Sequence, residues 1–123
     1  MPALCSVVSQ EASLTLHLAA YAAIATISLL LLLTSCTDPG TLPKGPYNGF
    51  AHRYCVACAS YAPPRSHHCR VSGRCIARFD HFCSATGSAV GRDNYGAFAA
   101  LVLAALASAG GVAAGSLAHL RLL

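Results

Sequence analysis

Two long stretches without a charged residue constrain this chain more than any other feature of its sequence. Between Glu11 and Asp38 lie 26 consecutive uncharged residues, and between Asp93 and Arg121 lie 27. Each stretch exceeds the roughly 20 apolar residues that an α-helix needs to cross a hydrocarbon core about 30 Å thick. A fold class follows directly. We expect a mainly α-helical membrane protein with two transmembrane helices that flank a polar middle.

The first transmembrane helix is predicted at residues 14–37, after an N-terminal tail of residues 1–13. Its apolar run includes five consecutive leucines at 29–33 and stops before Asp-Pro-Gly at 38–40, where proline ends a helix. A cleavable secretory signal is the alternative for this span. Its length argues against that, since signal h-regions have about 7–15 residues, and no Lys or Arg precedes the run. The second helix is predicted at residues 95–120.

The segment between the helices is rich in cysteine, histidine and proline. Residues 38–54 read as a linker in which three prolines prevent regular structure, and residues 55–94 hold five of the seven cysteines. Thiolate and imidazole groups are the ligands of tetrahedral Zn²⁺, and a turn such as Cys55-x2-Cys58 brings two sulfurs to one ion. We therefore predict a zinc-bound domain of irregular loops, with short β-hairpins at the C-x2-C and His-Cys turns. Since little apolar surface is available here, zinc is expected to supply much of the folding energy.

Basic residues indicate the orientation of this segment. Residues 38–93 contain seven Lys or Arg against three Asp, whereas the N-terminal tail has none and the C-terminal tail has one arginine. The positive-inside rule then places the cysteine-rich loop in the cytosol, with the organelle left open. A reducing compartment disfavours disulfides, so metal binding or catalysis is the better interpretation of the cysteines.

The loop's positive charge suits anionic lipid headgroups or a phosphate-bearing ligand more than nucleic acid, because the loop is tethered to a bilayer. A nucleic-acid-binding zinc knuckle would require C-x2-C-x4-H-x4-C, which is absent. A redox C-x-x-C motif is also disfavoured, since no βαβ pattern surrounds Cys55 and Cys58.

The motifs of the middle segment occur in a distinctive order. Cys55-x2-Cys58 is followed by Pro-Pro-Arg-Ser-His-His-Cys at 63–69, by Arg74-Cys75, and by Asp-His-Phe-Cys at 80–83. Their joint order and spacing closely resemble the cysteine-rich domain of the DHHC-type protein S-acyltransferases (palmitoyltransferases). The resemblance covers roughly residues 38–98 and extends to the flanking helices.

This resemblance implies two structural zinc sites, each with three cysteines and one histidine. The first maps onto residues that are all present: Cys55, Cys58, His68 and Cys75. The second maps onto Cys69 and three positions without a good ligand, namely Ser72, Phe82 and Ala89. We predict one zinc ion rather than two.

The resemblance also implies a catalytic set, with Cys83 as nucleophile, His81 as its base and Asp80 as the carboxylate that orients the imidazole. The thiolate would attack a fatty acyl-CoA, and a membrane-proximal cysteine of a protein substrate would then accept the acyl group. The CoA phosphates are expected to meet arginines of the loop: Arg74, Arg78 and Arg92.

Three departures from the family pattern set up an alternative. Phe82 replaces the second histidine of the catalytic box, Ser84-Ala85 replaces Pro-Trp, and the chain has two predicted helices instead of four and no Thr-Thr-x-Glu motif. The chain is then a short, divergent member, in which a homodimer would help to enclose the acyl chain. The alternative is a catalytically inactive membrane adaptor held together by zinc. Only the enzyme forms a hydroxylamine-labile acyl adduct on Cys83.

Overall fold

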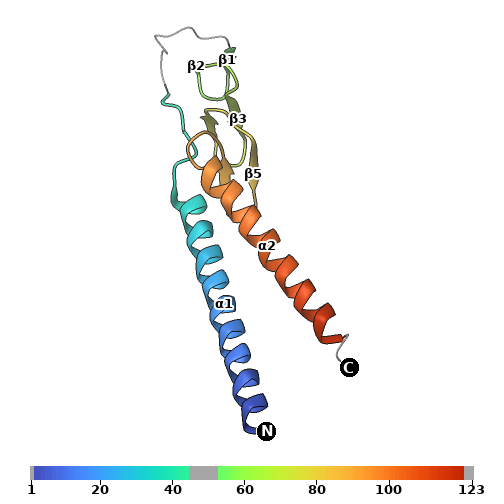
Figure 1. The fold of residues 1–123 in the computed structure, drawn as a ribbon. Helices are drawn as coiled ribbons and strands as arrows, with labels where there is room; N and C mark the ends of the chain where they lie inside the picture. Colours follow the sequence, from blue (N-terminus) through green and yellow to red (C-terminus); the bar gives the residue numbers. More distant parts are fainter. Residues whose placement is uncertain (1, 45–52, 121–123) are drawn as a thin grey trace. The chain divides into compact units, whose positions relative to one another are not determined.

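The computed structural model describes residues 2–44 and 53–120; part of the expected linker, residues 45–52, lies outside the described residues. Two long helices bracket six short strands (Figure 1). The chain divides into two units, one of residues 1–29 with 102–123 and one of residues 30–101. The elements in chain order are α1 (Pro2–Cys36), β1 (Arg53–Cys55), β2 (Ser60–Ala62), β3 (His67–Cys69), β4 (Arg74–Ile76), β5 (His81–Cys83), β6 (Ser88–Val90) and α2 (Tyr95–Leu120).

Both helices contain a segment that is long and apolar enough to cross a membrane. These segments are Ser13–Cys36 and Tyr95–Leu117, each with a mean hydropathy of 2.1. Their large apolar side chains are exposed, for example Leu16 and Leu106. An apolar surface of this length needs lipid or another protein to cover it.

Helix α1 begins earlier than the predicted membrane span, so the segment expected as an N-terminal tail is helical from Pro2 onward. Proline is well placed in the first turn of a helix because the N–H that it lacks would have no partner there. None of residues 3–13 is Gly or Pro, so nothing in the sequence interrupts the helix before the span.

The unit of residues 30–101 is built on three β-hairpins of the same design. In each, two antiparallel three-residue strands are joined by a four-residue turn, and the hairpins begin at residues 53, 67 and 81, which are 14 positions apart. Figure 1 shows them one after another, with β5 nearest the first turn of α2. The last residue of each turn has a positive φ: Ala59 (50°), Gly73 (65°) and Gly87 (64°).

The hairpins at the C-x2-C and His-Cys turns confirm the prediction, whereas the third hairpin, at the Asp-His-Phe-Cys box, was not predicted. In all three, the last residue of the first strand is a cysteine, namely Cys55, Cys69 and Cys83. The repeat therefore places three sulfurs at equivalent positions at the start of three similar turns.

A close approach of three backbone segments holds the second and third hairpins to the end of α1. Ile76 and Val90 are fully buried, and Gly91 lies against them. A Cβ atom at Gly91 would collide with the carbonyl oxygen of Pro39 and with the Ile76 side chain. Only glycine lets the chain after β6 pass this close to the segment that leaves α1.

Asn94 ties the same region together through its amide group. The side chain is completely buried, and its Nδ2 donates to the carbonyl oxygens of Thr34 (3.1 Å) and Ala89 (2.8 Å). Its Oδ1 accepts a hydrogen bond from the backbone N–H of Gly91 (2.9 Å). A second link runs from the hydroxyl of Ser35, which donates to the carbonyl oxygen of Thr86 (2.8 Å). The last turn of α1 is thus linked to β6 through the Asn94 amide and hydrogen-bonded directly to the β5–β6 turn.

Candidate catalytic and metal sites

Strand β5 carries the predicted nucleophile and base on one face. Side chains alternate along a strand, so His81 and Cys83 point to the same side, and Asp80 immediately precedes them. The Nδ1–H of His81 donates to Oδ2 of Asp80 over 3.0 Å. The hydrogen bond to Asp80, together with a further one to Cys83, raises the pKa of His81. Nδ1 is therefore engaged by the carboxylate, which leaves Nε2 as the proton acceptor.

The thiol of Cys83 is activated mainly by donors from the turn that follows it. The backbone N–H of Thr86 is the largest influence, followed by the Thr86 hydroxyl, the His81 side chain and the N–H of Ala85; together they outweigh burial and lower the pKa of Cys83 to about 7. An ordinary cysteine thiol is largely protonated at neutral pH. The lowered pKa gives Cys83 a larger thiolate fraction at neutral pH than an ordinary cysteine has, which suits a nucleophile.

Helix α2 contributes to the orientation of the base. The ring of Phe98 meets the His81 imidazole edge to face, with centroids 5.0 Å apart and planes at 68°. Asp80 on one side and Phe98 on the other thus restrict the rotation of the imidazole.

Four metal-binding side chains converge between the first two hairpins. The ligand atoms of Cys55, Cys58, His68 and Cys75 all lie within 4.8 Å of one another. His68 and Cys75 are partners in the β3–β4 register, so both point to the same side of that hairpin. The Nδ1 atom of His68 lies 3.2 Å from the Cys58 sulfur and 4.0 Å from the Cys75 sulfur.

This donor set fits zinc by its chemistry. Three sulfurs and one imidazole nitrogen match the tetrahedral preference of Zn²⁺. Burial and the neighbouring thiols of Cys55 and Cys58 raise the pKa of Cys75 to about 12, whereas the backbone N–H of Cys58 lowers the pKa of Cys55. Several thiolates cannot accumulate this close together without a cation, and a divalent metal would supply that charge.

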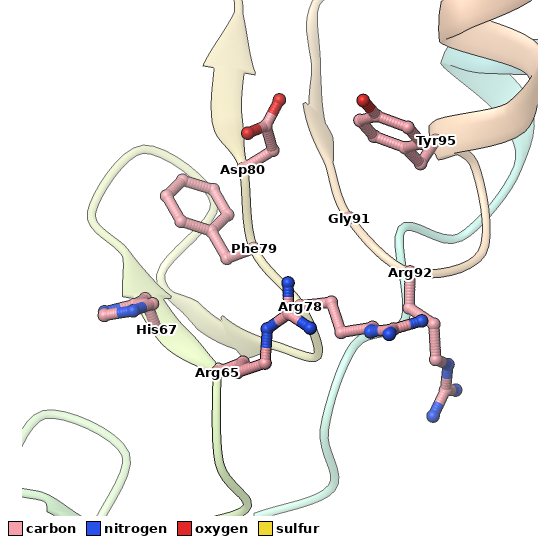
Figure 2. Close-up of a pocket in the computed structure, with 8 residues that line it drawn as sticks. All are labelled: Arg65, His67, Arg78, Phe79, Asp80, Gly91, Arg92 and Tyr95. Atoms are coloured by element: carbon pink, nitrogen blue, oxygen red, sulfur yellow. The ribbon is translucent and has the colours of Figure 1, made fainter.

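A pocket of about 540 Å³ adjoins the start of β5 and is rich in basic groups. Figure 2 shows the arginine side chains toward one end of it and Asp80 and Tyr95 toward the other. Asp80 belongs both to this pocket and to the pair with His81. The pocket is lined by Arg65, His67, Arg78, Phe79, Asp80, Gly91, Arg92 and Tyr95.

Comparison of the sequence with known protein families identifies the family of this chain. A family model described as DHHC palmitoyltransferase matches residues 48–121, which is more than half of the chain. The chain belongs to the DHHC palmitoyltransferase family. The Asp-His-Phe-Cys box of β5 is this member's version of the motif that names the DHHC family.

Several curated relatives agree with that assignment. The chain is 37% identical over 91 aligned positions to "Putative ZDHHC-type palmitoyltransferase 1" of Dictyostelium discoideum, covering 57% of this chain and 21% of the relative. It is 46% identical over 59 positions to "Probable protein S-acyltransferase 13" of Arabidopsis thaliana, covering 48% and 20%. It is 35% identical over 104 positions to human "Palmitoyltransferase ZDHHC18", covering 59% and 27%. The matched part thus spans about a fifth to a quarter of these DHHC relatives.

The positions predicted to have lost the second zinc site of the DHHC family do come together, but as an apolar cluster. Cys69, Ile76 and Ala89 are buried in contact, and Phe79 and Phe82 pack against them. Ser72 lies in the β3–β4 turn, where burial acts to raise the pKa of Cys69 and the turn residues outweigh it and lower that pKa. Among the residues that the structure describes, the Cys55 group is the one cluster with metal-binding geometry.

The three arginines predicted for CoA do not share one site. Arg78 and Arg92 line the large pocket, and Arg92 also pairs with Asp93 through two hydrogen bonds of 2.7 and 2.9 Å. Arg74 instead lines a smaller pocket of about 230 Å³ beside Lys44, Cys58 and Cys75.

Sequence reasoning missed Arg65 and His67 as pocket residues. Strand alternation separates the two histidines, since His68 faces Cys75 while His67 faces the opposite side of β3. The exposed His67 side chain lies in the large pocket, with its Nδ1 atom 3.5 Å from Nη2 of Arg53. A period-2 reading of His67-His68-Cys69 would have separated their roles.

Proposed function

We propose that this chain carries the catalytic domain of a membrane-bound protein S-acyltransferase, which transfers a fatty acyl group from acyl-CoA to protein cysteines through an acyl-Cys83 intermediate. The observation that supports it most is the ordered set on β5: a thiol with a pKa of about 7, an imidazole beside it and a carboxylate bonded to that imidazole. Family membership supplies the reaction class, since the curated relatives are named for palmitoyl and S-acyl transfer.

The mechanism follows from these groups. The Cys83 thiolate attacks the thioester carbonyl of the acyl-CoA, and the CoA thiolate leaves, taking up a proton. In the second step Nε2 of His81 removes the proton from a substrate cysteine, whose sulfur attacks the acyl-Cys83 carbonyl and frees the Cys83 thiolate. Asp80 holds the imidazole and stabilises its charged form.

One zinc ion is proposed to hold the first two hairpins together, with Cys55, Cys58, His68 and Cys75 as its ligands. Its contribution is structural, because all four coordination positions are filled by protein ligands. The third hairpin, which carries Cys83, relies on the apolar cluster with Phe82 and Ala89.

The two apolar segments are proposed to span the bilayer, with the cysteine-rich unit on the cytosolic side, where acyl-CoA is available. The basic excess of residues 38–93 supports this orientation. Protein substrates are then those with a cysteine near the membrane surface. A homodimer stays a prediction.

The pocket beside Asp80 is proposed to receive the CoA phosphates through Arg78 and Arg92, with Arg65 and His67 in addition. Guanidinium groups bind phosphate oxygens in pairs, and several of them around one cavity favour a ligand with several phosphates. Arg74 is left out because it lines a different pocket.

Replacing Arg78 with glutamine is expected to raise the KM for palmitoyl-CoA about tenfold with little change in the maximal rate, since one charge-assisted phosphate contact is lost. The measurement is the initial rate of acyl-adduct formation as a function of acyl-CoA concentration. The matched control is Arg70→Gln, an exposed arginine of the β3–β4 turn that lines neither pocket. If the Arg78→Gln variant depends on acyl-CoA concentration as the unmodified chain does, Arg78 does not contribute to binding acyl-CoA.

The test of the proposed function is direct detection of the intermediate. The zinc-loaded full chain in lipid nanodiscs is incubated with a clickable palmitoyl-CoA and digested with trypsin. Cleavage after Arg78 and Arg92 releases peptide 79–92, in which Cys83 is the sole cysteine. We expect a hydroxylamine-sensitive acyl group on this peptide. A folded, zinc-loaded chain without label would favour the inactive adaptor.

A further inference from the structure

The large pocket at the start of β5 has two chemically different ends. Figure 2 shows the arginine side chains toward one end and Asp80 and Tyr95 toward the other. In the part of the chain that the structure describes, neither Arg65 nor Arg78 forms an ion pair, so both guanidinium groups are available to an anion. The other end carries a carboxylate, which repels phosphate, and a phenol hydroxyl. The pocket therefore favours a ligand that is anionic at one end and uncharged at the other.

The end with Asp80 and Tyr95 is the one that leads to the catalytic pair. Oδ2 of Asp80 is bonded to Nδ1 of His81 over 3.0 Å. Tyr95 is the first residue of α2, and the ring of Phe98, three residues later, meets the His81 ring with centroids 5.0 Å apart. Residues three apart lie on one face of a helix. The first turn of α2 thus presents the same face to the pocket and to the imidazole.

Tyr95 has a fixed backbone and an unused hydroxyl. Its N–H donates to the carbonyl oxygen of Gly91 over 3.0 Å, and Gly91 is itself part of the pocket wall. The side chain is 51% exposed. Among residues 2–44 and 53–120 its hydroxyl has no hydrogen-bond partner. A phenol hydroxyl can both donate and accept, so it can serve a ligand in the pocket.

Acyl-CoA has the polarity that this pocket favours. Its nucleotide part carries the phosphate groups, whereas the pantetheine arm between the nucleotide and the thioester is uncharged and contains amide groups. With the phosphates at the guanidinium end, the arm would pass Tyr95 on its way to β5, the strand of Cys83. An amide of the arm offers both a donor and an acceptor to the phenol hydroxyl.

We propose that Tyr95 is a specificity residue of the acyl-CoA site: its hydroxyl hydrogen-bonds to an amide of the pantetheine arm and so directs the thioester toward Cys83. Asp80 contributes by keeping the phosphates away from that end of the pocket. The inference rests on the proposed function, because it takes acyl-CoA as the ligand. It assigns Tyr95 to the uncharged arm, whereas Arg78 and Arg92 are assigned to the phosphates.

Two ligands that differ by the pantetheine arm test this role without any acyl transfer. Coenzyme A has the arm, and adenosine 3′,5′-bisphosphate is a nucleotide part without it. Isothermal titration calorimetry gives the Kd of each for the zinc-loaded full chain in nanodiscs, under reducing conditions. Tyr95→Phe keeps the ring and removes the hydroxyl. We expect it to raise the Kd for coenzyme A about fivefold, the scale of one neutral hydrogen bond, and to leave the Kd for the bisphosphate unchanged.

Two other variants calibrate this result. Arg78→Gln removes a phosphate contact and is expected to raise the Kd of both ligands about tenfold. The matched control is Tyr61→Phe, which should change neither Kd. Tyr61 is 51% exposed, as Tyr95 is, but its ring packs against Tyr54 and lines neither pocket. Zinc content and helical circular dichroism report on folding, and an unchanged Kd for the bisphosphate shows that the pocket of Tyr95→Phe is intact.

Each outcome bears on the proposal. A Kd for coenzyme A that is unchanged in Tyr95→Phe overturns the role of the hydroxyl, and so does an equal rise for both ligands, which would indicate a general change in the pocket. If neither ligand binds the unmodified zinc-loaded chain, the site itself is overturned.

Failure of the transferase is seen separately. Binding of coenzyme A that depends on Tyr95, without an acyl adduct on Cys83, supports recognition of the arm while the proposed function fails. An acyl adduct on a chain whose affinity for coenzyme A does not depend on the Tyr95 hydroxyl supports the proposed function and overturns this inference.

Discussion

Replacement of Cys83 by alanine abolishes the acyl adduct on peptide 79–92 if the proposed chemistry is right. The alanine variant lacks the only atom that can form the thioester, so we expect label to fall by at least about a thousandfold, the scale on which loss of a nucleophile reduces catalysis. The side chain is only partly buried, and its loss leaves a small space at the end of β5. The protein should therefore fold and retain its zinc.

The matched control is Cys36→Ala, since Cys36 is an exposed thiol at the end of α1. Its removal should leave the label on peptide 79–92 unchanged. Acyl label that persists at full yield on other peptides of the Cys83 variant would mean nonenzymatic acylation of exposed thiols.

In the unmodified chain the rate of acyl-adduct formation should rise with pH through about 7, because the Cys83 thiolate forms there. His81→Ala should lower the rate by about a hundredfold or more at neutral pH.

Removal of the metal is the second large effect that we expect. Cys55, Cys58, His68 and Cys75 draw their ligand atoms from two hairpins, so a metal ion held by them would link the two hairpins directly. Structural zinc in such small domains supplies on the order of 10 kcal/mol of folding free energy. Chelation should therefore unfold β1–β4 while both helices remain helical.

Hydrogen exchange follows the hairpins, and circular dichroism follows the two helices. We expect amides of β1–β4 to lose protection on chelation, and those of β5 and β6 to lose less, because the apolar cluster around Phe82 supports them. Cys58→Ala should reproduce the chelated state, whereas Cys69→Ala removes a buried thiol outside the ligand set and should retain one zinc per chain. Unchanged protease resistance after metal removal, or two zinc ions per chain, would contradict this account.

The two helices and the metal-ligand set were within reach of sequence reasoning. Charge-free runs reveal helices of membrane length because a single charge at the centre of such a run is costly in lipid. The ligand set follows from thiols and imidazoles at short separations, and the structure brings Cys55, Cys58, His68 and Cys75 together. The third hairpin was not predicted, although the equal spacing of Cys55, Cys69 and Cys83 indicates a repeat of 14 residues.

The composition of the basic pocket could not be read in the same way. Arg65 and Arg78 have positive φ angles of 63° and 49°, a conformation that arginine seldom adopts. These local reversals of the chain aim Arg65 and Arg78 at one cavity and leave Arg74, on β4, beside another.

The buried amide of Asn94 has a consequence for the order in which the protein is made. The residue joins Thr34 across 60 positions of chain, so this bond cannot form until the start of α2 has left the ribosome. Each hairpin, by contrast, closes a turn of four residues and can pair as soon as it emerges. The two hairpins with the predicted metal ligands can thus form before the surroundings of Cys83 are complete. A nascent chain that stalls before residue 94 would contain all four predicted metal ligands yet lack the amide that joins Thr34 of α1 to Ala89 of β6.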